Sequence, residues 1–415
     1  MAQANGGGPT GLPLSGVLVL EVGSHIAGPF CCTQLADLGA DVIKIEAPGA
    51  GDSMRGHAPF VNGEAGVFLR VGRNKRSIAL DLRQQAGKEA FLRLVDRADV
   101  VVENLRPGNM DRLGLGWSVL SVRNPRLVYT AVSGWGRSGP YADDGGLDIM
   151  AQAMSGIMSI TGPEGGDPAK AGIPVCDLAC ALYGALATLA ALRARDASGE
   201  GQLVDVSLFE SGVSLTVWEA ARYFSTGEVP HALGSAHQSG APYQAFRAAD
   251  GYLTAGAPNQ GLFERLCKAL GLEGLIDDER FANNAARFKN RPALVAAIEE
   301  VTAPLPRAEV LATLSAAGVP CSALQHYDEV AADPQLAARG FFKETEHPSA
   351  GAVRQLGNPM YFSEQALPMR LPSPRLGEHS AEVLASLGYS PTEFAELLEA
   401  GVVAEAGAEV PRAAH

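Results

Sequence analysis

The fold of this chain is limited most tightly by residues 17–46. Val17–Val22 is a short β-rich run, residues 24–39 turn into an apolar segment, and Ala40–Glu46 is a second β-rich run. A strand, a helical segment and a second strand in this order predict a βαβ unit. Such a unit implies a parallel sheet that binds its ligands beyond the carboxyl ends of its strands. The glycines of the first turn do not form a dinucleotide-binding fingerprint, so a nicotinamide cofactor is not supported.

The rest of the chain extends this pattern. Further strands are predicted at residues 77–82, 99–103, 127–133 and 203–208, and helices at 84–97, 147–159 and 391–400. Residues 242–246 and 252–256 flank Ala249-Asp-Gly251 and predict a hairpin, with two or three helices following through Ala317. We therefore expect four parts: a flexible N-terminus (1–13), a large α/β domain with a parallel, Rossmann-like sheet (14–222), a smaller α+β domain (223–330) and a C-terminal segment that returns to the large domain (331–415). The tail after Gly401 is expected to fray.

A second informative stretch is residues 172–195, where a short extended piece leads into a long run of good helix formers. Its apolar side chains recur at helical spacing and predict a buried stripe of Leu178, Leu182, Ala185, Leu186, Leu189 and Leu192. Asp177 opens this helix, so its carboxylate is expected beside unpaired backbone N–H groups and the positive end of the helix dipole. A carboxylate in that place is either an N-cap or a nucleophile that forms a covalent acyl intermediate.

Composition limits the partners of the chain. Its 415 residues carry a net charge of −13, which disfavours nucleic acid and anionic membranes, so an anionic ligand must be bound by local basic clusters. One such cluster, Arg70, Arg73, Lys75 and Arg76, precedes the strand at 77–82 and is either a phosphate site or a solvated loop. The six cysteines lack disulfide or metal-ligand spacing, so we expect free thiols and no metal. With no signal peptide, transit peptide or long apolar run, a cytoplasmic location is expected.

Several ordered motifs resemble the class III CoA-transferases, a family that shares its fold with α-methylacyl-CoA racemase. The motifs are AGPF at 27–30, LGADVIKIE at 38–46, GRNKRSIALDL at 72–82, VENLRPG at 102–108, DRLGLG at 111–116, SGWGRSGPY at 133–141 and GEGQLVDVSLFES at 199–211. Within the family the chain is most similar to the succinyl-CoA:glutarate type, through residues 155–178 and 233–246. The resemblance covers residues 14–401 and implies an interlocked dimer.

The resemblance also implies a mechanism and a set of site residues. The catalytic aspartate of the family falls on Asp177, which attacks an acyl-CoA to form a mixed anhydride and then an aspartyl-CoA thioester. The positions expected to bind CoA are His25, Ile26, Ala27, Arg73, Lys75, Arg76, Asn104, Leu105, Arg106, Arg112 and Ser133. CoA thioesters are then substrates, and no metal or permanently bound cofactor is needed. Helix dipole and backbone donors are expected to keep Asp177 ionised.

Substrate identity is open at this point. The loop His237-Gln238-Ser239-Gly240 stands where the oxalate-using branch has a glycine run, so a larger acid, such as a dicarboxylate, is expected and this loop is a candidate substrate contact. Asp148 is either structural or an assistant in the site. Arg55, Arg137 and Arg222 are candidates for binding a distal carboxylate.

Two other functions compete with a homodimeric transferase. A racemase requires a His–Asp pair, and this chain has Leu147 in front of Asp148, so one of the two bases is missing. The second alternative is a CoA-binding subunit that pairs with a homologous chain in a heteromer acting on an aromatic succinate.

Overall fold

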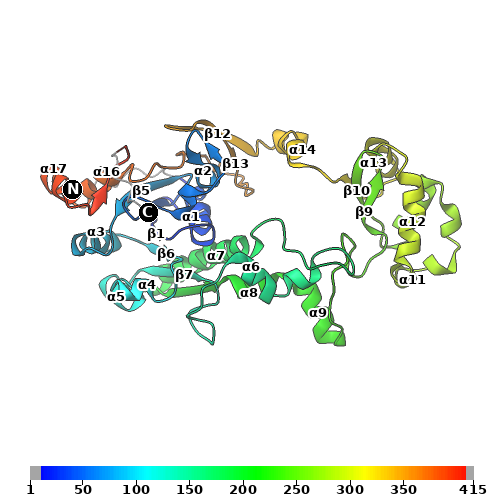
Figure 1. Cartoon of the computed structure of the whole chain (residues 1–415), viewed down its shortest axis with the longest axis horizontal. Helices are drawn as coiled ribbons and strands as arrows, with labels where there is room; N and C mark the ends of the chain where they lie inside the picture. The colour runs from blue at the N-terminus through cyan, green and yellow to red at the C-terminus, as the bar shows by residue number, and fades with distance from the viewer. Residues whose placement is uncertain (1–10, 408–415) are drawn as a thin grey trace. The chain divides into compact units, whose positions relative to one another are not determined.

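The computed structural model describes residues 11–407, which group into two units (Figure 1). The first unit comprises the chain up to Ile157, Ala171–Ala220 and the chain from Leu336; the second comprises Met158–Lys170 and Ala221–Gln335. Residues 158–170, which we expected in the large domain, therefore group with the small one. Most of the expected flexible segment 1–13 lies outside the described residues.

The first unit is built on a seven-stranded sheet. Its strand order is β14 (Val403–Ala404), β5 (Lys75–Leu80), β2 (Asp41–Glu46), β1 (Leu18–Val22), β6 (Val100–Glu103), β7 (Val128–Ser133) and β8 (Leu203–Ser207). All neighbours are parallel except β14, which runs antiparallel to β5. The chain moves from β1 toward β5 on one side and from β6 toward β8 on the other. The α/β prediction is confirmed, and the reversal of strand order between β1 and β6 marks the place where ligands bind in such sheets.

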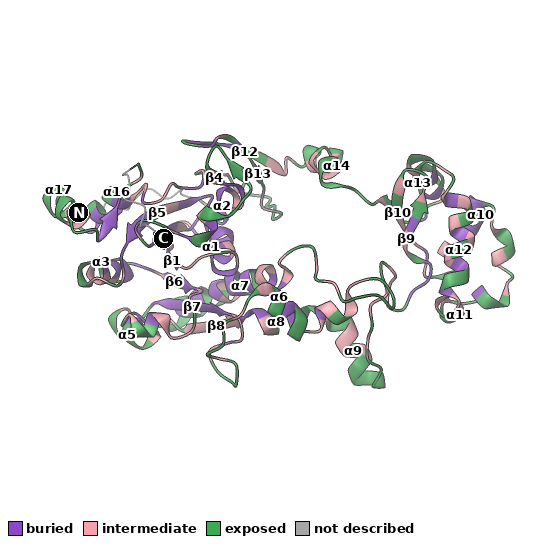
Figure 2. Cartoon of the chain, in the orientation of Figure 1, coloured by how far each residue is buried: buried purple, intermediate pink, exposed green. Residues whose placement is uncertain are grey.

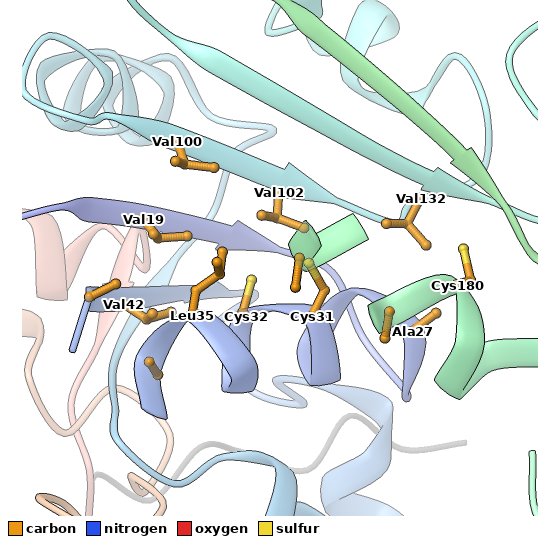
Figure 3. Close-up of a cluster of buried hydrophobic side chains, with 14 of the residues drawn as sticks. Val19, Ala27, Cys31, Cys32, Leu35, Val42, Val100, Val102, Val132 and Cys180 are labelled. Atoms are coloured by element: carbon orange, nitrogen blue, oxygen red, sulfur yellow. The ribbon is translucent and has the colours of Figure 1, made fainter. Parts of the chain in front are cut away.

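Helices cover both faces of this sheet. On one face α1 (Ala27–Asp37) and α7 (Val175–Ser198) pack on valines of β1, β2, β6 and β7. Figure 3 shows Cys31, Cys32 and Cys180 among these valines, where they serve as small packing side chains. All six cysteines lie within the described residues, where they are free. The other face is covered by α3 (Gln85–Val95), α5 (Trp117–Arg123), α16 (Ser380–Ser386) and α17 (Pro391–Glu399).

The remaining elements outside the second unit's own sheet and helices are short, and of these α14 lies in the second unit while η2, α9 and α15 cross the boundary between the units. They are η1 (Ser53–Gly56), β3 (Phe60–Val61), β4 (Glu64–Ala65), α2 (Gly66–Val71), α4 (Asn109–Arg112), α6 (Asp148–Met154), η2 (Ile157–Ile160), α8 (Leu208–Leu215), α9 (Val217–Thr226), α14 (Tyr327–Ala331), α15 (Pro334–Ala338), β12 (Phe342–His347) and β13 (Gly351–Leu356).

The second unit has its own sheet and core. The predicted hairpin is confirmed as β9 (Tyr243–Ala248) and β10 (Gly251–Gly256), and β11 (Cys321–Ala323) adds a third antiparallel strand. The helices that follow number more than the two or three expected: α10 (Gln260–Leu270), η3 (Glu273–Leu275), η4 (Glu279–Phe281), α11 (Asn284–Lys289), α12 (Arg291–Thr302) and α13 (Arg307–Ala316). Phe246, Leu253 and Phe263 are fully buried among them.

Helix α7 forms as predicted, and Ala185 and Leu192 of the predicted stripe are buried, but two of its leucines are exposed. Leu182 and Leu186 are 52% and 63% exposed, while the buried side consists mainly of small residues, Cys176, Cys180, Gly184, Thr188 and Ala191. A Cβ at Gly184 would stand 3.3 Å from Cys31 Sγ, and Thr188 Oγ1 lies 2.7 Å from Thr130 Oγ1. Because α1 and β7 approach this closely, only small side chains fit. By length and composition α7 is the one helix of residues 11–407 that could cross a membrane, and half of its most apolar stretch is buried in the protein.

The tail was expected to fray after Gly401, but residues 402–404 are packed against the sheet. Val402 and Val403 are each 2% exposed, and Val403 and Ala404 pair with Leu80 and Ala79 of β5. Burial of two valines at a sheet edge offsets the entropy that favours fraying.

Candidate active site

The carboxyl ends of the central strands meet the N-termini of α6 and α7 at a hollow of about 160 Å³. Eight of the residues predicted from the sequence line it: His25, Ala27, Asn104, Leu105, Arg106, Ser133, Asp148 and Asp177. These residues come from five separate segments of the first unit, so the sheet brings them together in the way the βαβ pattern implied.

Asp177 is a partly exposed residue in the first turn of α7. The helix begins at Val175 with Pro174 in the N-cap position, so Asp177 is not the N-cap. Burial, and after it the charge of Asp148, raises the pKa of the Asp177 carboxyl to about 7. The expectation that dipole and backbone donors keep it firmly ionised is therefore corrected, because desolvation and a like charge outweigh them.

The backbone donors of this turn are given to Asp148 instead. Asp148 Oδ1 accepts hydrogen bonds from the N–H groups of Cys176 (2.9 Å) and Asp177 (3.2 Å). Gln152, which is fully buried, donates to Asp148 Oδ2 at 2.6 Å and accepts from the N–H of Ala171 at 2.8 Å. Asp148 thus fixes the start of α7 from another helix. Sequence reasoning missed Gln152, although its spacing of four residues from Asp148 on a helix was an available signal.

The loop between β1 and α1 is held by a hydrogen bond to the buried side chain of Asp52. His25 has a φ of 67°, in the left-handed region, and its N–H donates to Asp52 Oδ1 at 3.1 Å. Asp52 is in turn ion-paired with Lys44 at 2.8 Å, and both side chains are 1% exposed. The His25 ring remains exposed, with Ser53 Oγ 3.1 Å from its Nδ1. No local signal identified Asp52, because it lies 27 residues from His25 in the sequence.

Asn104 locks this loop to the loop after β6. Its Oδ1 accepts from the N–H of Ser24 at 3.0 Å and its Nδ2 donates to Ser24 O at 2.8 Å. The side chain lies so close to the backbone that a Cβ at Gly23 would stand 1.8 Å from Asn104 Oδ1, and one at Gly28 would stand 2.7 Å away. The two glycines therefore permit close approach of an amide side chain.

Three of the four cations in the basic cluster, which the sequence left as a phosphate site or a solvated loop, form ion pairs in the structure. The pairs are Arg73 with Asp37 (2.7 Å), Lys75 with Glu21 (2.7 Å) and Arg76 with Asp41 (2.5 Å) and Glu382 (2.8 Å). Arg73 and Lys75 are buried, and the Arg76 side chain is 19% exposed. Arg73 and Lys75 have buried partners, and removing either cation from its partner to bind a ligand costs several kcal/mol, so these two residues stabilise the fold around β5.

The three arginines considered for a distal carboxylate are also paired. Arg55 contacts Glu46, Arg137 contacts Glu103 and Asp111, and Arg222 contacts Glu228. Arg106, by contrast, is exposed at the hollow and forms no ion pair with the described residues. Arg106 is thus the cation of this site that is available to an anionic ligand.

The other predicted residues do not line the hollow. Ile26 is partly buried against the cluster of Met54, Ala65 and Phe68, and Arg112 is exposed on α4, where it contacts Asn109. His237, Gln238, Ser239 and Gly240 belong to the second unit. There the His237 ring stacks on Tyr243 with centroids 4.7 Å apart.

Comparison with known proteins identifies the family of this chain. Residues 14–380 match the model of the CoA-transferase family III. The chain belongs to this family. It is 39% identical to a succinate–glutarate CoA-transferase of Agrobacterium fabrum, across 90% of this chain and 96% of that protein. It is 37% identical to a succinyl-CoA:glutarate CoA-transferase of Homo sapiens, across 94% of this chain and 90% of that protein.

A solved structure gives the same result. The crystal structure of a CaiB/BaiF family protein from Brucella suis superimposes with a TM-score of 0.83 at 40% identity, covering 91% of this chain and 99% of that one. This family III CoA-transferase is therefore an enzyme that uses CoA thioesters and carboxylates as substrates, and its similarity to the glutarate-type relatives confirms the resemblance inferred from the motifs.

Proposed function

We propose that this enzyme moves CoA from succinyl-CoA to a dicarboxylic acid, with Asp177 as a covalent nucleophile. The observation that carries the proposal is the position of Asp177, whose carboxyl lines the hollow at the switch point of the sheet. No hydrogen bond to this carboxylate is present among residues 11–407, so its oxygens are available for attack. The names of the relatives supply the donor and the acid class.

The transfer proceeds through four exchanges. The Asp177 carboxylate attacks the thioester carbonyl of succinyl-CoA, which expels CoA thiolate and leaves a mixed anhydride. The thiolate attacks the aspartyl carbonyl, releasing succinate and leaving an aspartyl-CoA thioester. The acceptor carboxylate attacks that thioester, expelling thiolate and forming a second anhydride. The thiolate then attacks the acceptor's acyl carbon, which restores Asp177 and releases the new acyl-CoA.

The raised pKa of Asp177 suits this role. A desolvated carboxylate with few hydrogen bonds is a stronger nucleophile than a solvated one, and a pKa of about 7 leaves a large ionised fraction at neutral pH. Asp148 contributes by occupying the N–H groups of the α7 N-terminus and by placing a negative charge beside Asp177.

For CoA itself we propose contacts with the loops that surround the hollow. The residues are His25, Ile26, Ala27, Asn104, Leu105, Arg106, Arg112 and Ser133. Among them Arg106 is proposed to bind a phosphate group of CoA, because it is the unpaired cation on the wall of the hollow.

The Arg106 proposal has a direct test. Arg106→Gln is expected to weaken CoA binding about 5- to 50-fold, the range for losing one charge-assisted contact. Isothermal titration with CoA measures this, and Arg126→Gln, which removes an exposed arginine just before the N-terminal end of β7, is the control. An unchanged affinity for CoA with a raised KM for the free acid would instead assign Arg106 to the acceptor.

A second copy of the chain is proposed to cover part of the first unit. Helices α6, α7 and α8 pack on one another and expose Ile149, Met150, Met154, Leu182, Leu186, Val213 and Leu215, which we call the α6–α8 surface. Figure 2 shows the exposed residues of α6 and α8. An apolar surface of this kind is typical of a subunit interface, which supports a dimer. A cytoplasmic location stays a prediction.

The structure offers no support for the racemase alternative, because the residue beside Asp148 at the hollow is not a base. The position that would need a base is Leu147, whose apolar side chain is 59% exposed and lines the hollow beside Asp148. A two-base proton exchange needs a second titratable group there. A heteromer with a homologous chain is distinguished by whether the purified chain is active alone.

The experiment is CoA exchange from succinyl-CoA to a panel of free acids, followed by mass spectrometry, with Asp177→Asn in parallel. Transfer to one or two dicarboxylates is expected, with a loss of at least 10³-fold in the variant because the nucleophile is absent. Deuterium wash-in at the α-carbon of a 2-methylacyl-CoA, with no transfer, would establish the racemase. Silence in both assays would indicate a missing partner chain.

A further inference from the structure

A buried acid stands directly before the loop that follows β6. Glu103 is the last residue of β6 and is 6% exposed, and its Oε2 accepts a hydrogen bond from the N–H of Leu105 at 2.9 Å. Asn104 lies between them and is bonded to Ser24. The Glu103 carboxylate therefore holds the backbone of the loop at Leu105, one of the residues proposed to contact CoA.

One arginine joins this acid to two other segments. Arg137 Nη1 lies 3.4 Å from Glu103 Oε1, and its Nη2 lies 3.5 Å from Asp111 Oδ2 on α4. Its guanidinium is 24% exposed, so the contact with Glu103, itself 7% exposed, is poorly screened by water.

The glycine loop that carries Arg137 is fixed at its base. The N–H of Arg137 donates to Asp205 Oδ2 of β8 at 2.9 Å, and the N–H of Gly136 donates to Ser133 Oγ at 2.9 Å. Gly136 has a φ of 92°, which favours glycine there. Arg137 is therefore bonded through its backbone to β8 and through its side chain to Glu103 and Asp111, at the two ends of the loop 104–112.

We propose that Arg137 and Glu103 are positioning residues that hold the loop 104–112 in its CoA-binding conformation, and that loss of the Glu103 charge releases the loop and weakens CoA binding. This inference rests on the proposed function only in taking that loop as a CoA contact.

Protonation is set to occur near neutrality. Burial, with a smaller contribution from the nearby Asp111, raises the pKa of the Glu103 carboxyl to about 7 against the opposing effects of the Leu105 N–H, Arg137 and Tyr129. The groups that face Glu103 are Arg137, Asp111 and Tyr129, whose own pKa is raised by burial and then by Glu103. Above pH 7 the carboxylate is charged and paired with Arg137. Below pH 7 it is neutral and the ion pair is lost.

The test is isothermal titration of the full-length enzyme with CoA at pH 6 and pH 8. In the unmodified enzyme, protonation of Glu103 is expected by itself to make CoA binding about three- to tenfold weaker at pH 6 than at pH 8. Glu103→Gln, which has the shape of the protonated acid, is expected to bind about three- to tenfold more weakly than the unmodified enzyme at pH 8 and equally at pH 6. Protonation of Asp177 at pH 6 favours an anionic ligand in both proteins, so it cancels in this comparison.

Two further variants complete the design. Arg137→Gln should bind CoA more weakly than the unmodified enzyme at pH 8 and equally well at pH 6, as Glu103→Gln does. The control is Arg123→Gln, which removes an exposed ion pair with Asp96 and should bind CoA like the unmodified enzyme at both pH values. A ratio between Glu103→Gln and the unmodified enzyme that is the same at both pH values would overturn the inference. So would the absence of any CoA binding. The titration measures CoA binding and not CoA transfer. Its result can therefore be interpreted even if the transfer assay fails.

Discussion

At the scale of single residues, the carboxyl of Asp177 is held in an environment that opposes its ionisation. Its pKa rises to about 7 from an ordinary 3.8, so the folded protein binds a proton that the unfolded chain releases. This charge destabilises the fold above the ordinary pKa, and the penalty grows up to about pH 7. Asp177→Asn is therefore expected to be more stable than the unmodified chain, with a gap in the free energy of unfolding that widens by about 1–2 kcal/mol from pH 5 to pH 8. Urea unfolding at both pH values measures the gap, and an equal gap at both would contradict the assigned environment.

The position of Asp177 could be predicted from the sequence, but its pKa could not. The turn from residue 172 into a run of helix formers gave the start of α7 to within two residues. The pKa depends on Asp148, 29 residues earlier in the chain, and on burial by several segments. The same limit applies to Arg73 and Lys75, whose partners Asp37 and Glu21 come from other elements.

At the scale of elements, α7 shows that the spacing of apolar residues predicts a helix without determining which of its faces is buried. Leucine spacing predicted the helix correctly, yet the buried face is the one with small side chains, since α1 approaches closely at Gly184. If the α6–α8 surface is a dimer interface, Leu186→Glu will place a charge in it and weaken the dimer at least tenfold. Analytical ultracentrifugation measures this, with Val122→Glu on α5 as a control, because Val122 is 81% exposed outside the α6–α8 surface. A monomeric unmodified chain would refute the proposed interface.

At the scale of the whole molecule, the switch point of the seven-stranded sheet determines where the hollow that contains Asp177 lies. The βαβ pattern predicted this sheet, since parallel strands joined by helices allow few other arrangements. The grouping of residues 158–170 with the second unit was not predictable, because it depends on long-range contacts such as Arg291 with Glu164 (2.5 Å).

The measurement that tests the central claim most directly is capture of the covalent intermediate. The enzyme is incubated with succinyl-CoA, treated with hydroxylamine, digested and examined by peptide mass spectrometry. Hydroxylamine converts an activated acyl group to a hydroxamate, so we expect that modification on Asp177, dependent on succinyl-CoA and absent from Asp177→Asn. An unmodified Asp177 peptide, together with CoA transfer that persists in Asp177→Asn, would contradict the account.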